Sequence, residues 1–197
     1  MAHQKVMSFD IVASQSLIWE RLSKISTANQ LGNAYLISGP RGCGKEGLAI
    51  RFSQLLNCEI SSVNPCDSCP SCQRFHQLQH EKLNLIFPLP TVKKTTSDNS
   101  DDISTVGNSD MELVTSAIAK KSKDHFYKIQ IPKANRILIQ SVRGLRKSLY
   151  LKSDPSGRKI VLILDAHLLS AGQGEAANAL LKILEEPPKN TTLVLVT

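Results

Sequence analysis

Aromatic residues are scarce in this chain, and long apolar runs are absent from it. Of its 197 residues, 5% are aromatic, 41% are hydrophobic and 21% are charged. The longest run of large aliphatic residues, 160–164, is far too short to span a bilayer as a helix. The N-terminal sequence MAHQKVMSFD lacks the apolar core of a signal peptide. We therefore expect a cytoplasmic protein with no membrane partner, and the globular composition excludes disorder throughout the chain.

Acidic residues are outnumbered by basic ones, which gives a formal net charge of +7. Such a charge suggests an anionic partner, nucleic acid or nucleotide, but a solvated basic surface explains it equally well. The length suits one large domain. Four of the five cysteines lie between positions 58 and 72, and in a cytosolic protein such clustering indicates metal binding rather than disulfides.

Short apolar runs alternate with helical patterns along the chain. Ile18, Leu22 and Ile25 are spaced as one apolar stripe of a first helix. The run 160–164 is apolar throughout, as in a central parallel strand covered on both faces. The pattern predicts helices over 8–30, 45–56, 139–149 and 174–186, and strands over 34–38, 83–87, 160–164 and 193–196. The order of these elements predicts an α/β fold with a parallel sheet. Because the chain ends one residue after a predicted core strand, we expect it to be a fragment.

One stretch has little capacity to form a core. Residues 95–110 contain no aromatic residue and only two large aliphatic ones. We interpret this stretch as part of a flexible insertion over 88–126, and an ordered acidic loop is the alternative.

A glycine-rich motif follows the first predicted strand. Residues 39–45 fit G-x-x-x-x-G-K, and a predicted helix comes directly after them. In such a loop the backbone N–H groups and the helix N-terminus bind phosphate oxygens, and Lys45 reaches the terminal phosphates. The predicted nucleotide-binding residues are Gly39, Pro40, Arg41, Gly42, Cys43, Gly44, Lys45 and Glu46.

Two positions of this site depart from what ATP hydrolysis needs. Glu46 follows the loop lysine, where a hydrolase has Ser or Thr to hold Mg²⁺. The strand that would carry the Walker B acids ends at Leu164, with Asp165 as a single remnant acid. Hydrolysis requires a positioned metal and a positioned water. We therefore predict a site with weak or absent ATPase activity, at which binding of ATP and Mg²⁺ is doubtful and no catalytic residue is assigned.

The cysteine cluster has the spacing C-x7-C-x2-C-x2-C, formed by Cys58, Cys66, Cys69 and Cys72. Four thiolates suit structural zinc, because they fill its tetrahedral coordination. An iron–sulfur cluster is the competing interpretation, but the expected fourth cysteine of that motif is replaced by His76. His76 and His80 are considered as substitute ligands and are more typical of surface residues here. We predict a structural zinc module over 58–72.

The helix 174–186 and its flanks carry a more specific signal. The sequence 176–188, AANALLKILEEPP, resembles the signature of bacterial DNA polymerase III clamp-loader subunits, the gamma/tau and delta-prime proteins. The resemblance to that family extends to residues 33–36, to residues 149–152 and to the four-cysteine module. It does not extend to residues 88–126. The resemblance implies a AAA+ P-loop NTPase core over 1–197, ending before the lid and collar domains.

The resemblance also implies a function, which is help in loading the sliding clamp onto primed DNA during replication. Gamma/tau subunits have Thr or Ser after the loop lysine and D-E-x-H at the Walker B strand, whereas delta-prime subunits often have degraded nucleotide sites. Glu46 and Asp165 place this sequence with delta-prime. Aligning on His167 puts Leu164 at the metal-binding position and Asp165 at the catalytic one. The expected partners are gamma/tau and delta subunits, with the clamp and the DNA reached through the complex.

Two alternatives remain open from the sequence. One is an active gamma/tau-like ATPase, in which Glu46 or Asp165 holds the metal unconventionally. The other is a zinc-dependent DNA-binding module that only borrows the scaffold, although Phe75 is the only aromatic residue near the cysteines. The resemblance to delta-prime subunits also implies an arginine, within a Ser-Arg-Cys motif, that is presented to the ATP site of a neighbouring gamma subunit. In this sequence we expect that motif just after residue 197.

Overall fold

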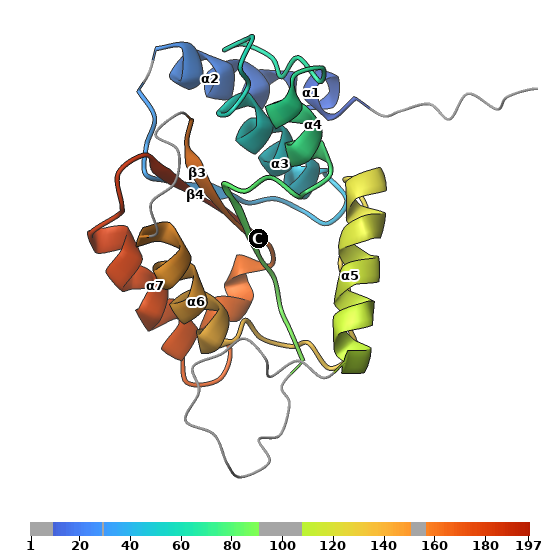
Figure 1. Ribbon diagram of the computed structural model, residues 1–197, viewed down its shortest axis with the longest axis vertical. Helices are drawn as coiled ribbons and strands as arrows, with labels where there is room; N and C mark the ends of the chain where they lie inside the picture. Colours follow the sequence, from blue (N-terminus) through green and yellow to red (C-terminus); the bar gives the residue numbers. More distant parts are fainter. Residues whose placement is uncertain (1–9, 29, 91–107, 151–156) are drawn as a thin grey trace, which may run out of the picture.

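The computed structural model shows a parallel sheet with helices on both faces (Figure 1). It describes residues 10–28, 30–90, 108–150 and 157–197. The helices are α1 Ile11–Ser14, α2 Ser16–Thr27, α3 Lys45–Leu55, α4 Pro70–His76, α5 Asn108–Lys123, α6 Ile139–Tyr150 and α7 Glu175–Glu185, with a 3-10 turn η1 at Ala166–Ser170. The strands are β1 Ala34–Ile37, β2 Leu83–Ile86, β3 Lys159–Ile163 and β4 Thr191–Val196. The predicted α/β fold with a parallel sheet is confirmed.

The strands lie in the order β1-β4-β3-β2, and every described pair is parallel. Leu36 pairs with Leu195, and Leu162 pairs with Val194. In a parallel sheet the carboxyl ends of all strands meet at one edge, so the loops after β1 and β3 lie near each other. This edge carries the phosphate loop and Asp165.

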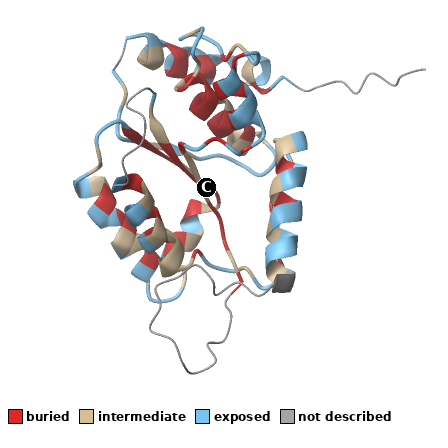
Figure 2. Ribbon diagram, in the orientation of Figure 1, coloured by how far each residue is buried: buried red, intermediate tan, exposed pale blue. Residues whose placement is uncertain are grey.

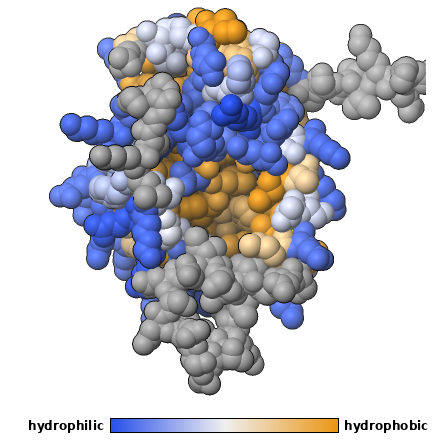
Figure 3. All heavy atoms as spheres, in the orientation of Figure 1, coloured by the Kyte–Doolittle hydropathy of each residue, from blue (hydrophilic) through white to orange (hydrophobic). Residues whose placement is uncertain are grey.

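Alternate residues of the central strands supply two separate cores. Figure 2 shows buried residues along the central strands and on the helices at either side of them. Leu162 and Val194 face α1, α2, α3 and α5, whereas Val161 and Leu193 face α6, α7 and η1. Because β3 is covered on both faces, its apolar residues 160–163 have essentially no exposed surface. In the face shown in Figure 3, apolar side chains gather near the centre of the molecule and hydrophilic ones cover the helices around them.

The first helical region differs from its prediction. The chain turns at Gln15 and divides the region into α1 and α2, and Gln15 donates from Nε2 to the Cys43 carbonyl at 3.0 Å. Trp19 and Leu22 are buried, but Ile18 is 46% exposed, so the predicted stripe through Ile18 is wrong. The buried face is set by contact with α3 rather than by the most regular spacing of aliphatic residues.

Two helices lie where no helix was predicted. Helix α4 begins at Pro70 with Cys69 as its N-cap, inside the cysteine module. Helix α5 lies within the predicted flexible insertion 88–126, of which 91–107 are outside the described residues. Helix α5 is stabilised by Ala117, which is buried in the core on the α3 side of the sheet, and by lysines in its last turn. Within the described residues, no helix combines the length and the apolar character needed to cross a membrane.

Candidate functional site

The glycine-rich loop that was predicted to bind phosphate connects β1 to α3 and contains two glycines with positive φ. Gly42 and Gly44 adopt φ angles of 82° and 80°, which are strained for any residue with a side chain. Gly44 caps α3, and its carbonyl accepts a hydrogen bond from the Leu48 N–H. A methyl group at Gly44 would lie 2.3 Å from Ile11 Cδ1, so α1 packs directly against the loop. The predicted loop residues 39–46 therefore lie together at the N-terminus of α3.

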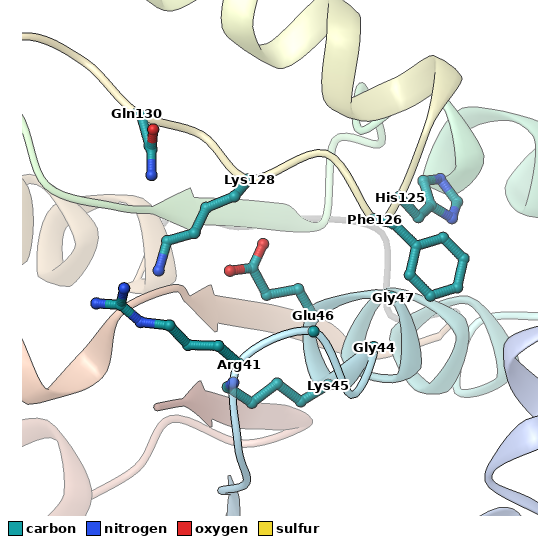
Figure 4. A pocket seen from close by; sticks show the side chains of 10 residues that line it. Arg41, Gly44, Lys45, Glu46, Gly47, His125, Phe126, Lys128 and Gln130 are labelled. Carbon is teal, nitrogen blue, oxygen red and sulfur yellow. The ribbon is translucent and has the colours of Figure 1, made fainter.

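Lys45 and Arg41 are the cations of the loop itself. Lys45 Nζ donates to the Pro40 carbonyl at 2.9 Å, which holds the side chain against the loop. Arg41 and Lys45 both line a cavity of about 250 Å³ in front of α3. Lys128 reaches toward the same space from the opposite side (Figure 4). Residues 125–130 thus form the second wall of the cavity.

Glu46, the residue that replaces Ser or Thr, forms an ion pair with Lys121 of α5. The Lys121 side chain is 0% exposed, and that of Glu46 is 15% exposed. Lys121 Nζ also donates to the carbonyl oxygens of His125 and Tyr127, at 2.9 and 2.8 Å. Burial lowers the pKa of Lys121, and the Glu46 carboxylate opposes that effect by favouring the charged form.

Asp165, which was predicted as a remnant Walker B acid, also forms an ion pair with a lysine. It lies two residues after the end of β3 in the left-handed conformation, with φ at 51°. Lys128 Nζ donates to Asp165 Oδ1 at 2.8 Å. Both carboxylates that could have held a metal are therefore paired with lysines from one segment, residues 121–128.

His125 lies between the phosphate loop and the cysteine module. Its Nε2 lies 3.1 Å from the His76 carbonyl, and the two imidazole rings are 4.7 Å apart. Burial lowers the pKa of His125 to about 4, and the positive charges of Lys121 and Arg51 act in the same direction. His125 is therefore neutral at neutral pH, with Nε2 as the donor to that carbonyl.

The four cysteines predicted as metal ligands converge in space. Their sulfur atoms all lie within 4.8 Å of one another, and Cys66 Sγ is 3.8 Å from Cys72 Sγ. That separation is close to the edge of a tetrahedron with metal–sulfur bonds of about 2.3 Å. Hydrogen bonding from Ser68 lowers the pKa of Cys66 to about 6. The cluster can hold a metal ion in a closed, all-sulfur site.

The cysteine cluster is fixed to α3 by polar side chains. Asp67 forms an ion pair with Arg51, and Gln54 Nε2 donates to Asp67 Oδ1 at 2.9 Å and to the Cys72 carbonyl at 3.0 Å. Trp19 Nε1 donates to Asn64 Oδ1 at 2.7 Å from the other side. The module therefore shares a supporting helix with the phosphate loop.

The two histidines near the cluster behave differently. His76 is exposed, as expected, but His80 is buried, so its assignment to the surface is wrong. The His80 ring stacks on Phe75 with centroids 4.2 Å apart, and His80 Nε2 lies 3.1 Å from Ser71 Oγ. Since His80 Nδ1 accepts from the Lys82 N–H, Nε2 is the protonated nitrogen and donates to Ser71. His80 supports the fold of the module beneath the cysteines.

Sequence reasoning missed Lys121 and Lys128 as residues of the site. Lys121 lies near the end of the predicted insertion 88–126, and Lys128 lies two residues after it. This part of the sequence contains no recognisable motif. The signal available was indirect, because a carboxylate such as Glu46 in a phosphate loop requires a compensating cation.

Comparison with known proteins supports a replication family. The family model described as DNA polymerase III, delta subunit, matches residues 14–197. The DNA polymerase III subunit tau of Bacillus subtilis (strain 168) is 27% identical over 190 residues, covering 96% of this chain and 25% of that protein. The subunit delta' of the same strain is 27% identical over 169 residues, covering 86% of this chain and 37% of that protein.

A third relative is also a DNA polymerase III subunit. The DNA polymerase III subunit gamma of Buchnera aphidicola subsp. Schizaphis graminum (strain Sg) is 27% identical over 191 residues, or 96% of this chain and 39% of that protein. The chain thus spans about a quarter to two-fifths of the length of these relatives. The family match agrees with the parallel α/β fold and with the glycine-rich loop before α3. The chain belongs to the DNA polymerase III, delta subunit family of clamp-loader AAA+ proteins.

Proposed function

We propose that this chain is part of a delta-prime-like subunit of the clamp loader, one that helps load the sliding clamp onto primed DNA without hydrolysing ATP. The observation that carries this proposal is the state of the two site carboxylates. Glu46 is paired with the buried Lys121, and Asp165 is paired with Lys128. Neither carboxylate can bind Mg²⁺ or orient water without first releasing a lysine. Gamma/tau and delta subunits are the proposed partners.

The same proposal assigns structural zinc to Cys58, Cys66, Cys69 and Cys72. The four-sulfur composition and the 3.8 Å sulfur separation support zinc, since a closed tetrahedral thiolate site is typical of it. A closed site has no open position for a substrate, so the metal supplies folding energy rather than chemistry. The residues also fit a metal sterically, because the cluster already brings the sulfurs within reach of one ion.

An active gamma/tau-like ATPase is the second candidate, favoured by the intact loop glycines and by Lys45 in the expected place. The two candidates differ in the role of Asp165. A reconstituted clamp loader containing the intact protein distinguishes them through ATP turnover in the presence of clamp and primed DNA.

In that assay, the Asp165→Asn variant of this subunit is compared with an equivalent Walker B change in the gamma/tau subunit. We expect Asp165→Asn to leave turnover within about twofold of the unchanged complex, while the gamma/tau change abolishes it. A comparable loss caused by Asp165→Asn contradicts the non-catalytic proposal and supports the active one.

A further inference from the structure

The C-terminus of helix α4 is completed by a residue that is distant in sequence. The last carbonyl groups of a helix have no partner within the helix. In α4, the carbonyls of residues 73–75 accept hydrogen bonds from the N–H groups of residues 77–79. The remaining carbonyl, that of His76, accepts from Nε2 of His125 at 3.1 Å, since a carbonyl can only accept. His125 thus satisfies the last of the four terminal carbonyls.

The other end of α4 is held by the cysteine cluster. Sγ of Cys69 accepts from the N–H of Cys72 at 3.4 Å, and both sulfurs belong to the four that converge. The carbonyl of Cys72 accepts from Nε2 of Gln54 in α3 at 3.0 Å. A helix of seven residues is too short to be stable alone. Helix α4 therefore depends on the cysteine cluster at one end and on His125 at the other.

His125 is held in place by residues outside the cysteine module. Its carbonyl accepts from Nζ of the buried Lys121 at 2.9 Å. Its Cβ lies 3.7 Å from the point that a methyl group on Gly47 would occupy, so it packs on the first turn of α3. Figure 4 shows the His125 ring turned away from Lys128. The donor for the His76 carbonyl is thus positioned by α3 and by the end of α5.

We propose that His125 is a positioning residue of the cysteine cluster, which raises the affinity of the four sulfurs for a metal ion by closing the C-terminus of α4. Coupling of this kind is reciprocal, so metal binding at the cysteines also orders residues 124–128, which include part of the second wall of the cavity. The proposal rests on the zinc assignment made above and is independent of ATP hydrolysis.

The physical reason is a difference between the metal-bound and the metal-free protein. With metal bound, the sulfur atoms are fixed, α4 is formed and the His76 carbonyl faces His125. Without metal, the Cys69 cap is released and the short helix loosens, because the metal supplies its local folding energy. The hydrogen bond then contributes only to the bound state, and the net value of one such bond corresponds to about fivefold in affinity.

The test is the Zn²⁺ affinity of the intact protein, measured by competition with a chromophoric chelator. His125→Leu keeps the bulk of the side chain but removes the donor, and we expect it to weaken Zn²⁺ binding by about fivefold. His125→Gln keeps an N–H donor and should stay within about twofold of the unchanged protein. The matched control is His76→Gln, which removes the ring 4.7 Å from that of His125 but leaves the carbonyl, and should also stay within about twofold.

Three results would overturn the proposal. The first is equal Zn²⁺ affinity of His125→Leu and the unchanged protein. The second is an equal loss in His125→Leu and His125→Gln, or a loss in His76→Gln, because the ring rather than the hydrogen bond would then be responsible. The third is a failure of the unchanged protein to bind Zn²⁺, which overturns the zinc assignment as well. ATP turnover enters none of these measurements, so failure of the proposed non-catalytic role is recognised separately.

A measurement on the unchanged protein decides the question even if His125→Leu does not fold. The N–H groups of Phe126 and Tyr127 donate to the side chain and the carbonyl of Asp124, at 2.9 Å each. We expect chelation of the metal to raise hydrogen exchange at these two amides by about threefold or more. Amides of α7 serve as the control, because α7 packs in the core on the other face of the sheet. Raised exchange in α4 with less than about a twofold change at Phe126 and Tyr127 contradicts the coupling.

Discussion

Among the ion pairs of the described residues, the pair between Glu46 and Lys121 is the most deeply buried. Both charges are removed from solvent, and the desolvation cost of such a pair is offset only while both partners and their hydrogen bonds are present. Lys121 additionally satisfies two carbonyl oxygens of the turn that follows α5. Loss of Lys121 alone therefore leaves a buried carboxylate and two unsatisfied carbonyl acceptors, whereas loss of both partners leaves only the acceptors.

The first prediction concerns this asymmetry. Lys121→Met should lower the free energy of unfolding by about 3 kcal/mol, because it leaves the Glu46 carboxylate unpaired. Adding Glu46→Thr to it should recover part of that loss, giving a non-additive double-mutant cycle. Urea denaturation of the four proteins in the cycle measures both effects, with Lys123→Met as the exposed control. Additive losses in the cycle contradict a direct interaction between the two residues.

His125 gives the second prediction, which concerns pH. Its pKa lies at about 4 in the folded protein, below the ordinary value of 6.5, so the unfolded chain binds the proton more readily. The unfolded state is therefore favoured increasingly as pH falls from about 6.5 toward 4, and above that window His125 contributes no pH dependence. Between pH 7 and 5 the expected loss of stability from this residue is about 2 kcal/mol.

Denaturation of the unchanged protein and of His125→Gln at both pH values measures this loss. The variant keeps a donor for the His76 carbonyl but cannot titrate, so its stability should fall less between pH 7 and 5. Both proteins retain His80, whose pKa is also lowered by burial, and the cysteine cluster. Their contributions therefore cancel in the comparison, and equal losses in the two proteins contradict the assignment to His125.

At the scale of elements, the cysteine module is joined to the rest of the fold mainly through α3 and through Trp19 of α2. Its helix α4 has only seven residues, and a helix of that length needs capping and packing to persist. Cys69 supplies the cap, because its Sγ accepts a hydrogen bond from the Cys72 N–H at 3.4 Å. A metal bound by these sulfurs would hold the cap in place.

The third prediction is that metal removal loosens this module selectively. Chelation should raise amide hydrogen exchange over 58–76 by about tenfold or more, because the metal supplies local folding energy there. Exchange in β3 and β4 should change little, since those strands are buried without help from the module. Unchanged exchange over 58–76 after confirmed loss of metal contradicts a structural role for metal at this cluster.

The sequence predicted those elements whose signal is local. The strands around Leu162 and Val194 are apolar on both faces, so their type and their central place followed from composition. Helix α5 was not predicted, because its apolar residues are sparse and its only fully covered charge, Lys121, looks like a surface lysine in sequence. The environment of Lys121 is created by Glu46, 75 residues earlier, and such long-range pairing has no local pattern.

The same distinction applies to the candidate site. The glycine-rich loop and the cysteine spacing are local motifs, and the structure brings the residues of each together. The second wall of the cavity, around Lys128, comes from a segment without a motif and depends on how the chain returns across the sheet edge. The motifs could thus predict a phosphate loop that lacks a metal ligand. They could not predict Lys121, the cation that balances the charge of Glu46.

At the scale of the whole molecule, the net charge of +7 raises the question of direct DNA binding. The cysteine module does not provide a stacking surface, because Phe75 is 0% exposed and packed on His80. Sequence-tolerant binding of single strands typically uses exposed aromatic side chains together with basic ones. The structure therefore argues against a DNA-binding module centred on the cysteines.

The fourth prediction follows from that arrangement. The intact protein alone should bind a fluorescent primed DNA weakly, with an affinity that falls as salt rises, because the contacts are between basic side chains and phosphates. Chelating the cysteine-bound metal should change the affinity by no more than about twofold, since the module contributes no base contacts. Anisotropy titrations over a salt series, before and after chelation, measure both quantities. A loss of about tenfold on chelation would restore the DNA-binding interpretation, because only a module that touches DNA through its metal-ordered residues can couple the two so strongly.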